Sequence, residues 1–281
     1  MIDRPHLLDV LNVRPLVLDA AMGTRLVALG LDLSRDDPAF WNLSRPDAVS
    51  SIHSLDVAAG ADVLLTNTFG ANRLWLAAFG RDHETLSINR RACSLARAAA
   101  GPNRHVLGSI GPSAAEDPSA CREQADLLAE LGVDAVLFET HTFDRAVRSL
   151  RATGPDSQIP RLVSLVSWPD PIGDAAARLE DLGAAVLGVN CERGMARSVE
   201  TARRLAQVTS LPLFVKPSAG LPGEPLDCPE TFRAAIPAIV SLGVRLIGGC
   251  CGTTDAHVAA IRAGCYDASD PKFPTQRNAT A

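Results

Sequence analysis

The sequence of 281 residues contains no apolar run near the length of about 18 residues that a membrane-spanning helix needs. Its first ten residues, MIDRPHLLDV, lack the uninterrupted apolar core of a secretory signal peptide. Positive charge is not in excess, because 27 Lys and Arg residues stand against 32 Asp and Glu residues, which gives a net charge of −5. The sequence therefore predicts a cytoplasmic protein that binds neither membranes nor nucleic acid, and it favours a small-molecule partner.

The chain also lacks a dinucleotide-binding fingerprint and a disulfide framework. A fingerprint would place several glycines after the first strand, but Gly23 stands alone in residues 19–24 (DAAMGT). The seven cysteines are odd in number and are not arranged as in a small disulfide scaffold. In a reducing compartment we expect such thiols to be metal ligands, nucleophiles or core residues.

Short apolar segments alternate with helical patterns eight times along the chain. The expected strands are 16–20, 62–66, 105–110, 135–139, 162–166, 185–190, 213–216 and 244–248. The expected helices are 46–59, 84–99, 119–131, 143–152, 171–182, 196–207, 229–242 and 255–263, and Gly60, Gly132, Gly183 and Gly243 are expected to end four of them in left-handed caps. Eight such units predict an α/β fold, a single-domain (β/α)₈ TIM barrel over residues 1–265, with a doubly wound sheet as the alternative. Residues 266–281 are expected to form a loose C-terminal tail.

Polar residues follow most of the expected strands, at the end of a TIM barrel where chemistry gathers. They include Asp19, Asn67, Glu139, Asn190, Lys216 and the pair Cys250–Cys251. Long connections follow the first, second and seventh strands. The first of these, residues 24–45, contains Phe40 and Trp41 and is expected either to act as a binding loop or to cover the barrel end.

Two adjacent cysteines lie in the glycine-flanked stretch 248–253 (GGCCGT), after the apolar run 244–247. Neighbouring residues meet disulfide geometry only with strain, whereas soft thiolates suit zinc. Two sulfur ligands leave a tetrahedral ion incomplete, so a third cysteine is expected. Cys191 is the best candidate, because it also ends an apolar, strand-like run. The alternative is that Cys250 and Cys251 are small buried residues of a tight turn.

Three thiolates on Zn²⁺ would leave a fourth position open, as in catalytic rather than structural zinc sites. A substrate thiol suits that position, because zinc lowers the pKa of a thiol and deprotonates it near neutral pH. The resulting thiolate could attack an alkyl group without a general base. The cysteines therefore predict alkyl transfer to sulfur, with Cys191, Cys250 and Cys251 as both the metal ligands and the catalytic residues.

Motifs from the first strand to the last resemble the zinc-dependent homocysteine S-methyltransferases. They are residues 19–24 (DAAMGT), 59–71 (AGADVLLTNTFGA), 188–191 (GVNC), 216–220 (KPSAG) and 248–254 (GGCCGTT). The second and last are most similar to the homocysteine-binding domain of cobalamin-dependent methionine synthase. The resemblance implies a (β/α)₈ barrel in which the three cysteines bind Zn²⁺ and the metal binds homocysteine sulfur, so that methyl transfer to the thiolate gives methionine.

The resemblance also implies roles for residues around the barrel mouth. Asp19 and Glu139 would face the ammonium group of homocysteine, which charge-assisted hydrogen bonds could hold. Backbone N–H groups near Ala20 and Ala21, and of residues 109–111 beginning at Ser109, could receive its carboxylate. Asn67 and Asn190 could support the site. Two alternatives stay open: Asp19 could cap a turn or helix, and Glu139 could pair with a nearby arginine such as Arg145.

The chain departs from the family pattern at two places. Ala20 stands where the family usually has glycine, and its β-carbon could crowd the substrate. In the stretch usually read as YPNAG, Lys216 replaces tyrosine and Ser218 replaces asparagine, and a lysine there could alter the donor side.

The methyl donor stays open between a separate methylcorrinoid protein and a small molecule such as S-methylmethionine. Two other functions also stay open. One is a methyltransferase of the same fold that acts on another thiol or on a selenol, and the other is a non-catalytic homocysteine-binding protein.

Overall fold

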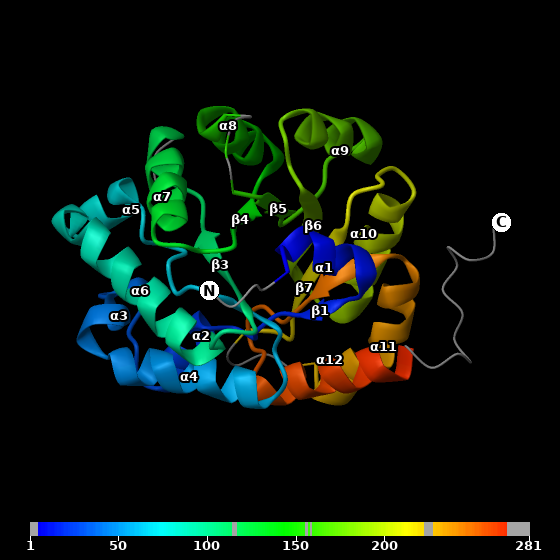
Figure 1. Cartoon of the computed structure of the whole chain (residues 1–281), viewed down its shortest axis with the longest axis horizontal. Coiled ribbons are helices and arrows are strands. Elements are labelled where there is room, and N and C mark those ends of the chain that lie inside the picture. The colour runs from blue at the N-terminus through cyan, green and yellow to red at the C-terminus, as the bar shows by residue number, and fades with distance from the viewer. Residues whose placement is uncertain (1–4, 114–116, 155–156, 158, 222–226, 269–281) are drawn as a thin grey trace.

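The computed structural model describes residues 5–113, 117–154, 157, 159–221 and 227–268, and it shows a parallel barrel surrounded by helices (Figure 1). The strands are β1 Leu16–Val17, β2 Val63–Leu65, β3 His105–Ile110, β4 Ala135–His141, β5 Arg161–Leu165, β6 Val186–Arg193, β7 Leu213–Ser218 and β8 Val244–Ile247. They hydrogen-bond in the order β1-β8-β7-β6-β5-β4-β3-β2. A parallel bridge between Leu18 and Val63 joins the first strand to the second and completes the ring. The predicted (β/α)₈ barrel is confirmed, and the doubly wound alternative is wrong.

One larger helix follows each strand, as the sequence predicted. They are α4 Pro46–Ala58, α6 Thr85–Ala100, α7 Ser119–Glu130, α8 Phe143–Thr153, α9 Ile172–Asp181, α10 Met195–Ala206, α11 Pro229–Ser241 and α12 Asp255–Ala268. Gly60, Gly132, Gly183 and Gly243 follow four of these helices with φ between 77° and 103°. Their predicted left-handed conformation is therefore confirmed.

Shorter helices were not predicted. They are α1 Leu7–Val13, α2 Gly23–Ala28, α3 Trp41–Ser44 and α5 Arg73–Ala77, with 3₁₀ turns at Pro38–Phe40 and Asp82–Glu84. Three of these elements lie in the expected loop 24–45, where Phe40 and Trp41 are buried. The expected tail, residues 266–281, starts inside α12, and its residues 269–281 lie outside the described part of the chain.

The barrel has an inner and an outer core, because successive residues of a strand point to opposite faces. Alternate strand residues such as Leu162, Val186 and Phe214 fill the interior, and Leu7 and Leu11 of α1 pack against them. In Figure 1, α1 accordingly lies over one end of the barrel. This end is the one at which the strands begin, so α1 leaves the opposite mouth to the residues at the strand ends.

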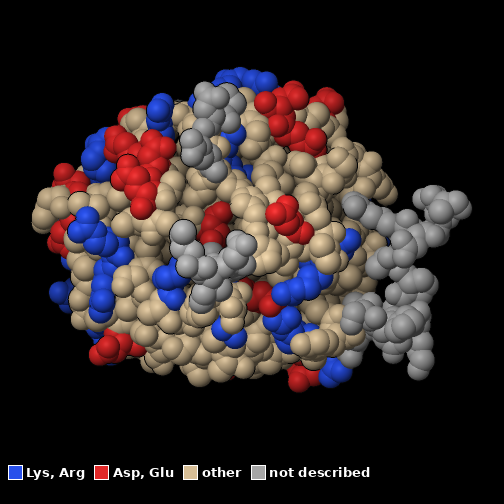
Figure 2. Space-filling model, viewed as in Figure 1, with Lys and Arg blue, Asp and Glu red and all other residues tan. Residues whose placement is uncertain are grey.

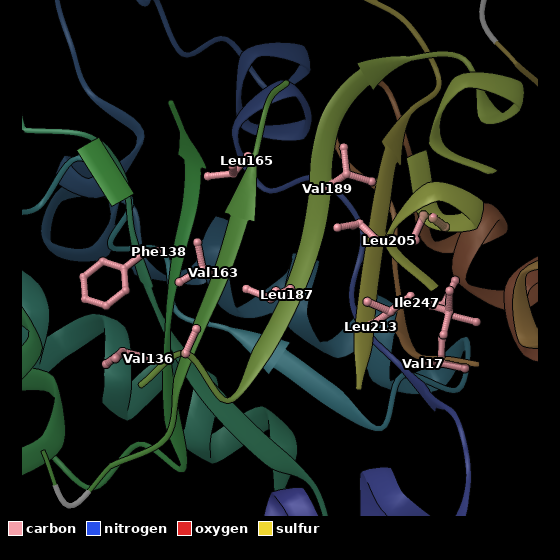
Figure 3. Close-up of a cluster of buried hydrophobic side chains, with 14 of the residues drawn as sticks. Val17, Val136, Phe138, Val163, Leu165, Leu187, Val189, Leu205, Leu213 and Ile247 are labelled. Atoms are coloured by element: carbon pink, nitrogen blue, oxygen red, sulfur yellow. The ribbon is translucent and has the colours of Figure 1, made fainter. Parts of the chain in front are cut away.

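The outer core lies between the strands and the helices. Val163, Leu187 and Val189 point outward from neighbouring strands and, with Leu205 of α10, belong to one buried cluster (Figure 3). Such double burial explains why the strands read as almost continuous apolar runs. On the face shown in Figure 2, acidic and basic groups are interspersed. Within the described chain, no helix is long and apolar enough to span a membrane.

At Gly188 of β6, the packing of the barrel interior is expected to exclude any residue with a β-carbon. A β-carbon there would lie 2.3 Å from the carbonyl oxygen of Phe214 and 2.6 Å from its Cβ, and a backbone atom cannot move aside easily. We expect Gly188→Ala to lower the free energy of unfolding by about 1–3 kcal/mol, measured by urea denaturation. In the control Gly173→Ala, on α9, the nearest atom would be 3.6 Å away. Equal stability of the two variants would contradict the packing argument.

Candidate metal and substrate site

The three cysteines predicted as metal ligands meet at the mouth of the barrel. The Sγ atoms of Cys191 and Cys250 are 2.8 Å apart, and those of Cys191 and Cys251 are 4.0 Å apart. All three sulfur atoms lie within 4.8 Å of one another, and all three cysteines are free of disulfides. Residues separated by about 60 positions in the sequence are therefore brought to one point.

The local backbone explains this convergence. Cys191 lies on β6 and the pair Cys250–Cys251 follows β8, and both strands neighbour β7. The backbone of Cys191 has φ of 60°, which is rare for a residue with a β-carbon and turns the chain at this point. The Cys250 N–H donates to the Pro217 carbonyl at 2.8 Å, and the Thr253 hydroxyl donates to the Cys250 carbonyl at 2.6 Å. The cysteine turn is thereby fixed to the end of β7.

The donor set suits zinc. Three thiolates at about 2.3 Å from a tetrahedral ion lie about 3.8 Å from one another, and the 4.0 Å distance between Cys191 and Cys251 agrees with that spacing. The sulfurs of Cys191 and Cys250 are closer than this and would have to separate to share an ion. Hydrogen bonds from Cys191 and then Cys250 lower the pKa of the Cys251 thiol to about 3, so the cluster favours a thiolate that attracts a cation.

Asn190 holds the cysteine cluster to the two preceding strands. Its Oδ1 accepts hydrogen bonds from the Thr140 N–H at 2.9 Å and from the Ser164 hydroxyl at 2.8 Å. Its Nδ2 donates to the Thr140 hydroxyl at 2.8 Å and lies 4.0 Å from the sulfur of Cys250. Asn190 is completely buried, so these contacts fix its orientation. This arrangement is compatible with the predicted supporting role, which remains a prediction.

On three strands, the inward-pointing residues become polar or charged as the strand approaches the mouth. Leu137 is followed two residues later by Glu139, Phe214 by Lys216, and Gly188 by Asn190. Because side chains alternate with period two, each of these residues takes the interior face as its strand ends. The interior thus changes from apolar at the start of the strands to charged and polar at their ends.

Glu139 has two side-chain partners inside the mouth. Its Oε1 accepts a hydrogen bond from the Ser109 hydroxyl at 2.5 Å, and its Oε2 lies 3.5 Å from Nζ of Lys216. Burial alone would lower the pKa of Lys216, but the Glu139 carboxylate outweighs it and the pKa is raised. Lys216 is therefore an ammonium ion. The alternative in which Glu139 pairs with Arg145 is not what the structure shows.

Asp19 lies at the end of the first strand, in the same group of charges. Its Oδ2 accepts a hydrogen bond from the Leu65 N–H at 2.7 Å, whereas Oδ1 is buried and has no hydrogen-bond partner among the described residues. Burial raises the pKa of Asp19 to about 8, although the positive charge of Lys216 lowers it. A cation placed at Oδ1 would find a free acceptor there.

Four of the backbone N–H groups predicted to receive a carboxylate already donate within the protein. Ala21 donates to the Thr253 hydroxyl at 3.1 Å and Ala20 to the carboxylate of Asp56. Ser109 donates to the Thr66 hydroxyl at 3.1 Å, and Gly111 donates to the carbonyl of Phe69 at 2.9 Å. Binding of a carboxylate at any of these groups would require an exchange of partners.

Asn67 is buried beside the first loop. Its Nδ2 donates to the Pro38 carbonyl at 2.7 Å, and its own carbonyl accepts from Asn42 at 2.7 Å. These bonds hold the loop after β1 against the loop after β2. The predicted substrate-side role of Asn67 stays a prediction, and the structure gives it a loop-fixing role.

The fold and the site define a (β/α)₈ barrel with a cluster of three cysteines that could hold a metal ion. A sequence profile described as homocysteine S-methyltransferase matches residues 16–265. The chain belongs to the homocysteine S-methyltransferase family, which confirms the predicted family and its class of enzyme, the methyltransferases.

Individual relatives agree with this family. The chain is 32% identical to methionine synthase of Mycobacterium tuberculosis and 33% identical to that of Mycobacterium leprae, with 95% of the chain covered in each case. It spans about a quarter of the length of these relatives, 26%. Among solved structures, the metallated form of the homocysteine methyltransferase MmuM from Escherichia coli is 25% identical with a TM-score of 0.76, and the match covers 91% of this chain and 98% of that one.

Proposed function

We propose that this chain catalyses zinc-dependent transfer of a methyl group to the thiol of homocysteine, which yields methionine. The observation that carries the proposal is the convergence of three thiols within 4.8 Å at the mouth of the barrel. Zinc held by Cys191, Cys250 and Cys251 would lower the pKa of the acceptor thiol and so make it nucleophilic. The membership of the family and the metallated form of MmuM support this assignment.

The residues of this chain would bind and orient the acceptor. The ammonium group of homocysteine would replace the missing partner of Asp19 Oδ1, in a charge-assisted hydrogen bond shielded from water. Glu139 would contribute negative charge to the same region. Asn190 would hold Cys250 in place through its bonds to Thr140 and Ser164.

For the methyl donor we propose either a separate methylcorrinoid protein or a small sulfonium compound such as S-methylmethionine. The similarity to methionine synthase, of which the chain spans 26%, supports a donor carried by another module or protein. The similarity to MmuM over 98% of its chain supports a donor that needs no further module.

A parallel turnover assay tests the proposal. Zinc-loaded protein is incubated with homocysteine and, separately, with methylcobalamin, S-methylmethionine, S-adenosylmethionine or betaine, and methionine is quantified. We expect turnover with methylcobalamin or S-methylmethionine. Methylation of another thiol or a selenol in preference to homocysteine would overturn the acceptor assignment. Tight homocysteine binding with no turnover from any donor would indicate a binding protein instead of an enzyme.

A further inference from the structure

Lys216 is a buried cation in the barrel mouth that can donate more hydrogen bonds than the one found for it among the described residues. Its side chain is 7% exposed, and Nζ contacts Glu139 Oε2 at 3.5 Å, which is long for a hydrogen bond. A lysine ammonium has three donors. Among the described residues, the hydrogen bond to Glu139 is the one found for this group, so further acceptors can approach it.

The charges around Lys216 determine which groups of a bound amino acid need a partner. The two carboxylates of Asp19 and Glu139 carry a charge of −2 when ionised, and Lys216 reduces it to −1. The ammonium group of an amino acid at Asp19 would neutralise that remainder. The carboxylate of the same amino acid would then again need a positive partner, because burying an uncompensated charge is costly.

Four of the backbone N–H groups predicted to receive that carboxylate already have acceptors within the protein. The N–H groups of Ala20, Ala21, Ser109 and Gly111 each donate to an internal acceptor. Lys216 lies on the interior face of β7 and interacts electrostatically with Asp19, Glu139 and the cysteine sulfurs. Its positive charge therefore acts on both the carboxylates and the cysteine sulfurs of the mouth.

We propose that the Lys216 ammonium binds the α-carboxylate of the acceptor amino acid, while Asp19 binds its α-ammonium group. This inference rests on the proposed function, because it assumes that the acceptor is homocysteine. Lys216 is then a specificity-determining residue for amino-acid thiols. The lysine side chain supplies a positive donor group on the interior face of β7.

The test combines deletion of the lysine with deletion of the carboxylate. Binding to zinc-loaded protein is measured by calorimetry for homocysteine, for 3-aminopropane-1-thiol, which lacks the carboxylate, and for 4-mercaptobutanoate, which lacks the amine. For the wild type we expect loss of the carboxylate to weaken binding about 10- to 100-fold. For Lys216→Met the same loss should change binding less than about threefold, because the carboxylate no longer has a charged partner.

Controls separate charge from folding. Lys216→Arg keeps the cation and should retain a carboxylate dependence of at least about tenfold. Arg203→Met removes an exposed cation that pairs with Glu200 on α10 and should behave as the wild type. If Lys216→Met fails to fold because Glu139 loses its partner, the double variant Lys216→Met/Glu139→Gln removes both charges together and is measured in its place.

The outcomes distinguish this inference from the proposed function. If no thiol binds to the zinc-loaded wild type, the proposed function fails. If homocysteine binds but removal of its carboxylate weakens binding equally with and without Lys216, the inference about Lys216 fails and the proposed function is unaffected. A Lys216 dependence for the amine instead of the carboxylate would also overturn it, because Lys216 would then occupy the position of the substrate ammonium.

Discussion

Replacing Cys250 with alanine is expected to reduce the zinc content of the protein from about one ion per chain to a small fraction. Mutation of groups that only support a zinc ligand costs about 10- to 100-fold in metal affinity, so loss of a ligand should cost at least about 100-fold. The reason is geometric, since two remaining sulfurs cannot saturate a site that already has one open position. Metal analysis after dialysis, followed by titration with a zinc indicator, measures the effect.

A buried cysteine outside the cluster provides the matched control. Cys93 on α6 is 6% exposed, and burial raises the pKa of its thiol to about 12, which disfavours the thiolate that metals bind. Cys93→Ala should therefore retain zinc at the wild-type level. A wild type that binds much less than one zinc, or a Cys250→Ala variant that keeps it, would remove the basis of the proposed chemistry.

Asp19→Asn is expected to weaken homocysteine binding by about 2–3 kcal/mol, roughly 30- to 150-fold. Asparagine keeps the shape and can still accept the Leu65 hydrogen bond, but it cannot supply the negative charge for an ammonium group. Calorimetric titration of homocysteine at pH 8 measures the change. Asp174→Asn, an exposed substitution on α9, is the control, and equal affinities of the two variants would contradict the assignment.

The pH dependence of binding gives a second measure of the same residue. Because the pKa of Asp19 is about 8 without substrate, the carboxyl group is mainly protonated at pH 6 and must ionise to bind a cation. Its contribution to affinity should therefore increase with pH, by up to about tenfold per unit, until pH 8. In Asp19→Asn, the part of the pH dependence of homocysteine affinity that comes from Asp19 should be lost. The part that comes from the substrate thiol should remain. A parallel dependence in both proteins would show that Asp19 does not titrate on binding.

The stability of the free protein should change in the opposite direction. The pKa of Asp19 is higher in the folded chain than its ordinary value of 3.8, so the folded state binds more protons between these values. The contribution of Asp19 to stability is consequently present below pH 4 and is lost as the pH rises to 8. Urea denaturation of the wild type and of Asp19→Asn across this interval measures the difference.

Much of the barrel could be predicted because its signals are local. Each strand is an apolar run, and glycines such as Gly132 and Gly243 end helices in a conformation that favours glycine. The short helices of the first loop were missed because they lack a sustained period. In that loop, the burial of Phe40 and Trp41 depends on contacts with distant segments.

Only those features of the site that follow from residue type and from the alternation of side chains along a strand could be predicted. The cysteine triad was found because thiols at two strand ends suggest one ion, and the structure does bring them together. The ion pair between Lys216 and Glu139 spans 77 positions and depends on the curvature of the barrel. The alternation along β7 could have placed Lys216 inside, but not its partner. The internal hydrogen bonds of Ala20 and Ala21 also required the coordinates.

The left-handed backbone of Cys191 has a consequence for the evolution of the protein. Its φ of 60° is the conformation in which glycine is most easily accommodated, and a side chain there lowers folding stability by about 1 kcal/mol or more. A Cys191→Gly change should therefore raise the folding stability of the metal-free protein, while it removes one of the three proposed metal ligands. Selection for stability alone would favour glycine at this position, and the proposed role of the sulfur in metal binding gives a reason for cysteine instead.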